Sequence, residues 1–473
     1  MHTRQYDLIV IGAGAVGENV ADRAVRGGLS VAIVESELVG GECSYWACMP
    51  SKALLRPAAA LRAARDVAGS REAVTGDLDV AAILARRDSI AHEWNDSGQV
   101  SWLDGAGIDL VRGHGEISGE RVVTVTDADG AVSELTARYA VAVCTGTAAL
   151  LPDIPGLADA APWTSREATS VQTVPESLVI LGGGVVACEM ATAFAALGSE
   201  VTIIARSGML GRMEPFAGEA VTAALRHAGV TVRLGVDVDR VDRDAPDAEV
   251  VVTLTDGSEV QAAEILVATG RVPRTGDLGL DAIGLEPGSW LEVDDTMRVG
   301  GFSWLYAVGD VNHRALLTHQ GKYQARAAGD VIAARATGAP VDDAPWGKHV
   351  ATADHDAVPQ VTFTDPEVAS VGFTEASARE ADRRIRVIDY DLSWVAGAST
   401  HADHYEGHAR AIFDEDRGVL IGATFVGPDV AELLHSATIA IVGEVPLARL
   451  WHAVPSYPTI SEVWLRWLEE YGR

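Results

Sequence analysis

The sequence predicts an α/β protein with two Rossmann-like dinucleotide-binding domains and a C-terminal α+β domain. A strand, a glycine-rich turn and a helix-like stretch occur near the N-terminus, and the same unit recurs 170 residues later. The length of 473 residues is enough for about three domains of ordinary size. Hydrophobic residues make up 48% of the chain, which suffices for a large buried core.

The first unit lies at residues 7–17, DLIVIGAGAVG, where an apolar strand leads into Gly12, Gly14 and Gly17. Glycines at this spacing allow a tight turn and the close approach of a pyrophosphate, and the following helix N-terminus adds partial positive charge. The next strand ends at Glu35, 23 residues after Gly12, the usual place of an acid that binds a ribose 2′-hydroxyl. This unit therefore suits the ADP half of FAD.

The second unit, LVILGGGVVA at residues 178–187, carries Gly182, Gly184 and Ala187 in the same frame. One glycine fingerprint is weak support for a nucleotide site, but two in register, each between a strand and a helix, are strong support.

The acid is missing from the second unit. Its place is taken by Ala205, which Arg206 follows, with Arg212 one short loop later. Guanidinium groups bind phosphate in a bidentate fashion, and the missing acid removes repulsion against a 2′-phosphate. We therefore expect NADPH here, with NADH as an alternative and with ordinary exposed charges as the other reading of the two arginines.

Residues 40–57, GGECSYWACMPSKALLRP, hold Cys43 and Cys48, and Pro50 then opens an Ala/Leu-rich helical stretch. A helix N-terminus stabilises a thiolate and lowers its pKa. Two such thiols one helical turn apart could close and reopen a disulfide by exchange. Zinc is the competing use of paired cysteines, but no second cysteine or Cys/His pair stands at ligand spacing, so we predict no metal.

The remaining thiols and a group of histidines have simpler explanations. Cys144 and Cys188 lie in apolar segments and are expected to be small buried side chains. His401, His404 and His408 would share one face of a helix, but neighbouring glycines and the lack of helical periodicity favour an exposed loop between strands.

Composition excludes several classes of partner. The formal net charge of −30 argues against nucleic acid and acidic membranes, because phosphates demand Lys and Arg. The apolar run at residues 8–16 is too short for a signal peptide or a membrane span, so we expect a cytoplasmic protein. In that reducing compartment a close cysteine pair is expected to be catalytic or metal-binding rather than structural. Lysine is rare, with only Lys52, Lys322 and Lys348.

The cysteine loop resembles the signature of the pyridine nucleotide-disulfide oxidoreductases, the family of glutathione reductase, lipoamide dehydrogenase and mercuric reductase. The likeness covers nearly the whole chain. Further segments that resemble the family are YAVAVCTGT (139–147), ILVATGRVP (265–273), WLYAVGDV (304–311), LLTHQ (316–320), VPQVTFTDPEVASVGFTE (358–375) and YPTISE (457–462).

By this resemblance, Cys48 would face the flavin of a bound FAD and Cys43 would exchange with the acceptor. Lys52 and Glu189 would form an ion pair near flavin N5, and Asp310 would hold the ribityl chain. The resemblance implies the following cofactor-binding residues: Gly12, Gly14, Gly17, Glu35, Gly41, Lys52, Thr145, Gly146, Gly182, Gly184, Arg206, Arg212, Gly270, Arg271, Gly309, Asp310, Thr318 and His319.

One departure from the family concerns acid–base chemistry. Disulfide reductases of this family use a His–Glu pair from the partner subunit, whereas here Tyr457 takes the place of the histidine and Glu462 is kept. A phenol with a reference pKa of about 10 is a poor base at neutral pH, although it can donate a hydrogen bond. The alternatives are that His452 substitutes for the imidazole, or that the Tyr457 ring packs at a dimer interface.

Two branches of the family resemble the chain at the altered positions. Mercuric reductases carry a tyrosine before this segment but end in a cysteine pair, and no cysteine follows Cys188 here. Soluble pyridine nucleotide transhydrogenases share YPT and a tryptophan like Trp46 but lack the second cysteine, which is present as Cys48.

The resemblance predicts an FAD-binding domain from residues 1–150 and 271–345, an NAD(P)-binding domain at 151–270 and a dimerisation domain at 346–473. It also implies a C2 homodimer, in which the C-terminal segment of each subunit completes the active site of its partner.

We therefore predict an enzyme that passes electrons from NADPH through FAD to a Cys43–Cys48 disulfide. A small-molecule acceptor, a disulfide or another thiol-reactive compound, would then take them. One alternative is flavin-only electron transfer, as in a transhydrogenase or a quinone reductase, with vestigial or regulatory cysteines. Another is a redox sensor without turnover. Dihydrolipoamide dehydrogenase activity is disfavoured because the histidine base is absent.

Overall fold

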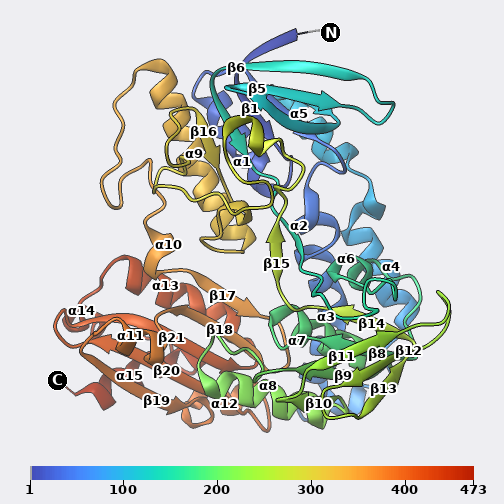
Figure 1. The fold of residues 1–473 in the computed structure, drawn as a ribbon. Coiled ribbons are helices and arrows are strands. Elements are labelled where there is room, and N and C mark those ends of the chain that lie inside the picture. Colours follow the sequence, from blue (N-terminus) through green and yellow to red (C-terminus); the bar gives the residue numbers. More distant parts are fainter. Residues whose placement is uncertain (1–2, 473) are drawn as a thin grey trace. The chain divides into compact units, whose positions relative to one another are not determined.

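The structure, a computed structural model, describes residues 3–472 and divides the chain into two compact units (Figure 1). The first unit comprises Met1–Pro50, Asp88–Leu150 and Arg271–His355. The second unit comprises Ser51–Arg87, Leu151–Gly270 and Asp356–Arg473. The predicted division into three domains stays a prediction.

The first unit is built on a seven-stranded sheet in the order β3-β2-β1-β6-β5-β4, with β16 paired to β6. The central strands β1, β2, β3, β6 and β16 run parallel, and β4, β5 and β6 form an antiparallel meander. Their bounds are β1 Thr3–Ile11, β2 Val31–Glu35, β3 Asp109–Arg112, β4 His114–Gly119, β5 Val122–Thr126, β6 Val132–Val143 and β16 Leu305–Ala307. Residues 8–11 of β1, 31–34 of β2 and 140–143 of β6 form apolar runs, as expected for strands buried on both faces.

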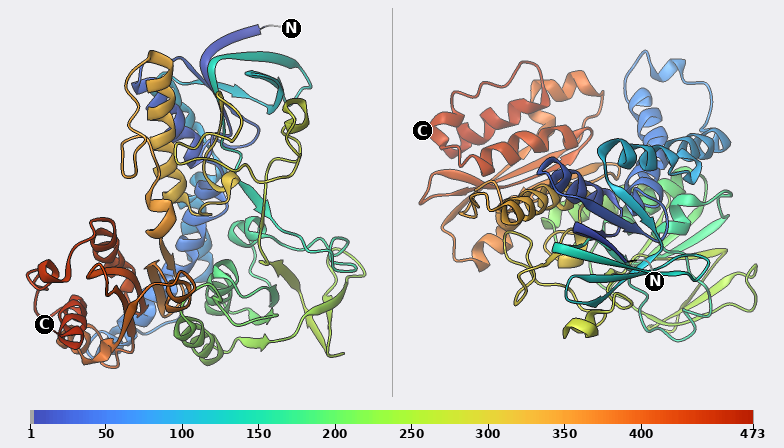
Figure 2. Two further views of the ribbon diagram at one scale, coloured as in Figure 1. Left: turned by 60° about the vertical axis from the view of Figure 1, so that its left-hand side comes forward. Right: turned by 90° about the horizontal axis from the view of Figure 1, so that it is seen from above.

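Helices α1 (Ala15–Arg26) and α9 (Thr318–Thr337) pack side by side in this unit (Figure 2). Glycine allows the close approach: a Cβ on Gly329 would lie 2.5 Å from the Cβ of Arg23. Arg23 also forms a bidentate ion pair with Asp330, with the shortest N–O distance at 2.6 Å. The other elements of the unit include α2 Gly41–Tyr45, α5 Ser97–Ala106, and the antiparallel pair β7 Thr147–Ala149 and β15 Arg271–Pro273.

The second unit holds another Rossmann-like layer, a parallel sheet in the order β10-β9-β8-β14. Its elements are β8 Ser177–Leu181, α7 Val185–Ala196, β9 Glu200–Ala205, α8 Pro215–His227, β10 Thr231–Leu234 and β14 Glu264–Val267. An antiparallel meander accompanies it, made of β11 Val238–Asp242, β12 Val250–Leu254 and β13 Glu259–Ala262.

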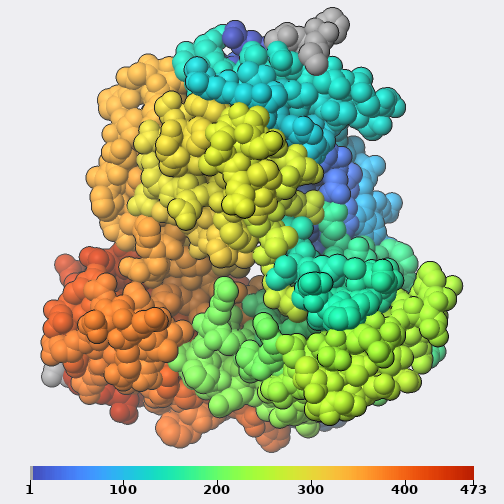
Figure 3. All heavy atoms as spheres, in the orientation of Figure 1, coloured from blue at the N-terminus to red at the C-terminus, as the bar shows by residue number. Residues whose placement is uncertain are grey.

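The second unit also contains a C-terminal antiparallel sheet in the order β17-β18-β21-β20-β19, whose residues form one continuous mass, orange to red, in Figure 3. The strands are β17 Pro359–Thr362, β18 Glu367–Gly372, β19 Ile385–Asp391, β20 His408–Asp414 and β21 Val419–Gly427. Helices α13 (Leu434–Val442) and α15 (Val463–Tyr471) contribute to the core of this sheet, where Trp467 is fully buried. The predicted α/β class with a C-terminal α+β part is thus confirmed.

Between residues 3 and 472, no helix combines the length and the apolar character needed to cross a membrane.

Candidate active site

The first glycine turn joins β1 to α1 at very short range. Gly12 has a φ of 99°, and a Cβ there would lie 2.6 Å from the carbonyl oxygen of Cys144. A Cβ on Gly17 would lie only 1.9 Å from the carbonyl oxygen of Gly12, whereas one on Gly14 would meet nothing nearer than 4.0 Å. Two glycines therefore allow close packing and the third leaves an open cradle at the helix N-terminus, as a pyrophosphate needs.

Glu35 lies beside this turn at the end of β2. Its carboxylate accepts hydrogen bonds from the backbone N–H groups of Ala13 (2.7 Å) and Glu37 (2.8 Å). Burial raises the pKa of Glu35, and the two backbone donors oppose that rise. The side chain is thus fixed in one orientation, and a carboxylate keeps lone pairs for a further hydroxyl donor.

Asp310, Thr147 and Arg271 form a hydrogen-bonded cluster. The Thr147 hydroxyl donates to Asp310 (2.9 Å), and Arg271 Nε donates to the Thr147 hydroxyl (2.5 Å). Burial raises the pKa of Asp310, while Thr147 and Arg271 lower it. Thr145 has a buried hydroxyl that finds no hydrogen-bond partner within the described chain.

These features fit an FAD. The open cradle at Gly14, the fixed Glu35 and the unpaired Thr145 hydroxyl each leave a group for a dinucleotide to use. The predicted cofactor glycines Gly41, Gly146, Gly270 and Gly309 all adopt a positive φ, at 60°, 69°, 154° and 84°.

Cys43 and Cys48 lie in two separate helices. Cys43 belongs to the short helix α2, which ends at Tyr45, and Cys48 is the first residue of α3 (Cys48–Arg65). The prediction that one helical turn joins the thiols is therefore wrong, because Trp46 leaves the helical conformation with a φ of −136°. Both cysteines are free thiols, and their side chains are nonetheless in hydrogen-bond contact.

The surroundings of the two sulfurs favour different protonation states. The hydrogen bond with Cys48 and burial raise the pKa of Cys43, while Thr318 and Lys322 lower it. Cys48 Sγ lies 3.3 Å from the Thr318 hydroxyl and stands at the N-terminus of α3, where the helix dipole favours a thiolate. These surroundings favour the proton on Cys43 and the negative charge on Cys48 when the pair is reduced.

Lys52 and Glu189 form an ion pair in the second unit. Lys52 Nζ lies 2.7 Å from Glu189 Oε2, and Glu189 Oε1 accepts the backbone N–H of Phe363 at 2.9 Å. The ammonium also lies 4.8 Å from the centroid of the Phe363 ring. Glu189 is 3% exposed, so a buried carboxylate holds the lysine in one direction. The predicted place of this pair near a flavin stays a prediction.

The second glycine turn repeats the geometry of the first. Gly182 has a φ of 122°, and a Cβ there would lie 2.3 Å from the carbonyl oxygen of Ala268. A Cβ on Gly184 would meet no atom within 4 Å, so this turn also has an open cradle. The Arg206 side chain is 81% exposed and Arg212 is exposed as well, so both can reach a phosphate.

The C-terminal segment holds Tyr457 and Glu462 in different surroundings. Tyr457 is 77% exposed, and His452 is exposed as well. Glu462 is buried, accepts the backbone N–H of Gly397 at 3.3 Å and lies 3.9 Å from Arg466. Within the described chain, neither Tyr457 nor His452 makes a hydrogen bond to this carboxylate.

The expectation of an exposed loop around the three histidines is wrong for two of them. His401 ends helix α12 (Ala396–His401) and lies 3.1 Å from Asp429, and His408 begins β20 and lies 2.8 Å from Asp389. A carboxylate thus contacts each of these two imidazoles, and both residues belong to regular elements rather than to a loop. No group of three or more His, Cys, Asp or Glu residues in the described part of the chain could hold a metal ion.

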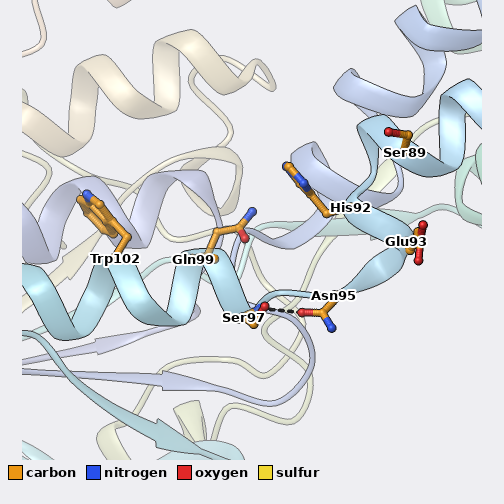
Figure 4. Close-up of a pocket in the computed structure, with 8 residues that line it drawn as sticks. Ser89, His92, Glu93, Asn95, Ser97, Gln99 and Trp102 are labelled. Carbon is orange, nitrogen blue, oxygen red and sulfur yellow. Dashed lines mark hydrogen bonds between the residues drawn. The ribbon is translucent and has the colours of Figure 1, made fainter.

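An open pocket of about 620 Å³ lies in the first unit (Figure 4). It is lined by Ser89, His92, Glu93, Asn95, Ser97, Gly98, Gln99 and Trp102. His92, Glu93 and Trp94 adopt three consecutive left-handed conformations, with φ of 51°, 51° and 54°. Trp94 Nε1 donates a hydrogen bond to the carbonyl oxygen of Tyr45 (3.2 Å), so this segment is hydrogen-bonded to the cysteine loop. No sequence motif indicated this pocket.

The structure groups the predicted residues into separate clusters. In the first unit it brings Thr318 to the cysteine pair and Arg271 to Asp310, and His319 is exposed at the start of α9. Sequence reasoning missed Thr147, which links Arg271 to Asp310, and Lys322. The rarity of lysine and the four-residue step from Thr318 to Lys322 could have indicated the latter.

Comparison with known families identifies the class of protein. Residues 6–330 match the family described as pyridine nucleotide-disulphide oxidoreductase, and residues 358–467 match the dimerisation domain of that family. The chain therefore belongs to the pyridine nucleotide-disulphide oxidoreductases. These are enzymes that bind FAD and use NAD(P)H, so the predicted enzyme class and the predicted cofactors are confirmed at that level.

Several curated proteins are similar over most of their length. A mercuric reductase of Shigella flexneri is 34% identical over 466 residues, which cover 96% of this chain and 79% of that protein. A dihydrolipoyl dehydrogenase of Halobacterium salinarum is 32% identical over 472 residues, which cover 96% and 94% of the two chains. Relatives named for different reactions are thus about equally similar, so identity alone does not select a substrate for this chain.

Solved structures share the fold. The Cu(II) complex of the HOCl-induced flavoprotein disulfide reductase RclA from Escherichia coli gives a TM-score of 0.83 at 23% identity, covering 99% of both chains. LpdA from Mycobacterium tuberculosis gives 0.82 at 24% identity, covering 98% of this chain and 100% of the other.

Proposed function

We propose that the protein passes electrons from NADPH through FAD to the Cys43–Cys48 pair and then to a disulfide or another thiol-reactive acceptor. The observation that carries this proposal is the contact between the two sulfurs, with Cys48 at a helix N-terminus and 3.3 Å from the Thr318 hydroxyl. FAD, when bound, supplies the conversion of a hydride into an electron pair that a disulfide can accept.

The cysteines then perform a balanced thiol–disulfide exchange. Two electrons and one proton open the Cys43–Cys48 disulfide to a Cys43 thiol and a Cys48 thiolate. After Cys43 releases its proton, its sulfur attacks one sulfur of the acceptor disulfide, whose S–S bond breaks and whose other half leaves as a thiolate and gains a proton. Cys48 then attacks the Cys43 sulfur, which restores the internal disulfide and releases the second half of the acceptor.

The other predicted residues have supporting roles in this proposal. The Lys52 ammonium, held by Glu189, stabilises negative charge at flavin N5. Arg206 and Arg212 bind the 2′-phosphate of NADPH and so favour it over NADH. This assignment is supported by the exposure of both guanidinium groups at the end of the second nucleotide unit.

We propose the domain division of the family for this chain: FAD binding by residues 1–150 and 271–345, NAD(P) binding by 151–270, and dimerisation by 346–473. Two copies form a homodimer, in which Tyr457 of each chain completes the site of the other chain. The family dimerisation domain at residues 358–467 and the 77% exposure of Tyr457 support this assignment.

The missing imidazole favours a second candidate, flavin-only electron transfer to a pyridine nucleotide or a quinone. Anaerobic reductive titration separates the two candidates. Uptake of four electrons per chain, with a long-wavelength thiolate-to-flavin band, supports the cysteine route, and two-electron bleaching supports the flavin route. Cys48→Ser should lower uptake to two electrons and abolish disulfide reduction, whereas the control Cys188→Ala should leave both unchanged. Undiminished disulfide reduction by Cys48→Ser contradicts the cysteine route.

A further inference from the structure

Helix α9 presents two polar side chains on the face that meets the cysteine pair. Thr318 starts the helix and lies 3.3 Å from Cys48 Sγ. Lys322 follows four residues later, and residues four apart lie on the same helix face. Lys322 therefore lies one helical turn after Thr318, the residue that contacts the Cys48 sulfur.

Tight packing fixes the first turns of α9 and α1 against each other. A Cβ on Gly321 would lie 2.6 Å from Cγ2 of Val16, so the α9 backbone can approach α1 only at a glycine. Further along, the Arg23–Asp330 ion pair holds the two helices together. Glu18, two residues after Val16, is thus brought towards Lys322, and their charges interact.

Both charged side chains lack direct partners. Lys322 is half-buried and makes no hydrogen bond or ion pair with any other residue between 3 and 472. One carboxylate oxygen of Glu18, Oε1, is buried and has no hydrogen-bond partner within that range. The Lys322 ammonium nevertheless acts electrostatically on two groups, Glu18 and the Cys43 thiol. Lys322 is thus a cation that has no ion-pair partner among the described residues and whose charge acts on the Cys43 sulfur.

We propose that Lys322 is a positioning residue for the Cys43 thiolate, and that Glu18 is the counter-charge that keeps the Lys322 side chain at this place. The proposal rests on the proposed function, because it concerns the sulfur that attacks the acceptor. It also explains how the chain manages with Tyr457 where the family has an imidazole. The ammonium stabilises the attacking thiolate by charge, while the released proton goes to solvent.

The charged groups that act on Cys43 are few. Cys48, from α3, opposes ionisation of Cys43, and Lys322, from α9, favours it. The Thr318 hydroxyl also favours it through a hydrogen bond. From α1, Glu18 acts on Lys322, and Glu35 acts on Glu18. Lys322 is therefore the cation among these groups, and its removal should lower the reactivity of Cys43.

The test measures alkylation of Cys43 rather than turnover. In a Cys48→Ser holoenzyme, iodoacetamide at pH 8 labels Cys43, and the labelled peptide is quantified by mass spectrometry over time. Adding Lys322→Met should slow labelling about three- to tenfold, because an opposite charge that favours the thiolate is lost. Lys322→Arg should restore the rate to within about twofold, because it keeps the charge.

A matched control is Lys348→Met, which removes a 63% exposed lysine paired with Asp330. This variant should label at the parent rate. Glu18→Gln should slow labelling less than Lys322→Met does, and faster labelling would overturn the assigned role of Glu18. Bound flavin absorbance and circular dichroism show whether each variant is folded, and Lys322→Gln provides a second neutral variant.

The two proposals fail in different ways. If Lys322→Met and Lys322→Gln label at the parent rate while the wild-type enzyme takes up four electrons, the role of Lys322 is wrong and the cysteine route stands. If labelling slows but the wild-type enzyme takes up only two electrons, the cysteine route is wrong and the effect of Lys322 on Cys43 stands.

Discussion

The two glycine turns use the same backbone geometry but differ at the third position of the motif. Gly12 and Gly182 both have a positive φ, and a Cβ on either would lie within 2.6 Å of a carbonyl oxygen, at 2.6 and 2.3 Å. At the third position the first turn has Gly17, where a Cβ would come within 1.9 Å of a carbonyl oxygen, and the second turn has Ala187, whose Cβ is fully buried. Helix α1 therefore packs closer to its strand than α7 does.

The turns also differ in charge. The residue after the third position is Glu18 in the first turn and the buried Cys188 in the second, where burial raises the pKa of the thiol to about 12. At the end of the next strand, Glu35 in the first unit corresponds to Ala205 in the second, which Arg206 follows. The same backbone arrangement thus carries an acidic side chain in the first unit and a basic one in the second, and in the proposed function this difference selects the nucleotide.

The largest effect should come from exchanging the third residues. Gly17→Ala adds a Cβ 1.9 Å from the Gly12 carbonyl oxygen, so the turn must shift, and the purified protein should lose its flavin. Ala187→Gly should keep the flavin and destabilise the protein by about 1 kcal/mol. Flavin absorbance per chain measures the first effect and thermal unfolding the second.

The control is Gly105→Ala in α5, where a Cβ meets no atom within 4 Å. It should leave the flavin content unchanged. If Gly17→Ala retains a full complement of flavin, the first turn accepts a Cβ at its third position as the second turn does, and the prediction is wrong.

The second prediction, with a smaller expected effect, concerns Arg206, the basic residue that follows β9. Arg206→Ala should lower kcat/KM for NADPH about 10- to 100-fold, because a charge-assisted contact with the 2′-phosphate is lost. The value for NADH should change less than about threefold. The control Arg240→Ala removes another exposed arginine, paired with Asp242 at 2.6 Å, and should change neither value. Equal losses with both nucleotides would contradict the phosphate assignment.

The sequence predicted the parts of this comparison that depend on local motifs. The glycines at 12, 14 and 17 and the acid at Glu35 require only a strand, a turn and a helix in succession, and the structure has them in that order. The α/β class followed from the recurrence of that unit. Such features are predictable because their physical cause lies within about 30 neighbouring residues.

Contacts between distant segments were not predictable in the same way. The break at Trp46 separates two helices where spacing suggested one turn. The approach of Lys322 to Glu18 depends on the packing of Gly321 against Val16, segments about 300 residues apart. The left-handed run at residues 92–94 has no sequence signal, because none of its residues is glycine.

The third prediction concerns Glu35, the acid at the end of β2. Glu35→Gln keeps one carbonyl oxygen but turns an amide N–H₂ towards either Ala13 or Glu37, whose N–H groups both now donate to the carboxylate. FAD affinity should fall about 3- to 30-fold, and flavin fluorescence on titration measures this loss. Glu37→Gln, which changes a neighbouring acid without removing the Glu35 carboxylate, should bind FAD as tightly as the parent protein. If both variants weaken FAD binding equally, the Glu35 carboxylate has no specific role in FAD binding, and the two turns do not differ in this respect.

The last expected effect, on the pH dependence of stability, follows from the contrast between Glu18 and Cys188. Burial raises the pKa of Glu18 from 4.5 to about 7, and Lys322 only partly opposes the rise. The folded state therefore holds a proton that the unfolded state releases between pH 4.5 and 7, so the contribution of Glu18 to stability falls as the pH rises through this range.

Glu18→Gln should remove this dependence. Against the parent protein, it should gain about 1–3 kcal/mol at pH 8 and change little at pH 4.5, where the folded carboxyl is protonated and the unfolded one is only half ionised. Thermal unfolding of the two proteins at both pH values measures the difference, and Glu200→Gln, at an exposed acid, is the control. If both variants gain equally at pH 8, the gain comes from the lower net negative charge of the whole chain. A gain confined to Glu18→Gln locates it in the first turn of α1, at the position that the second glycine turn fills with a neutral, buried thiol.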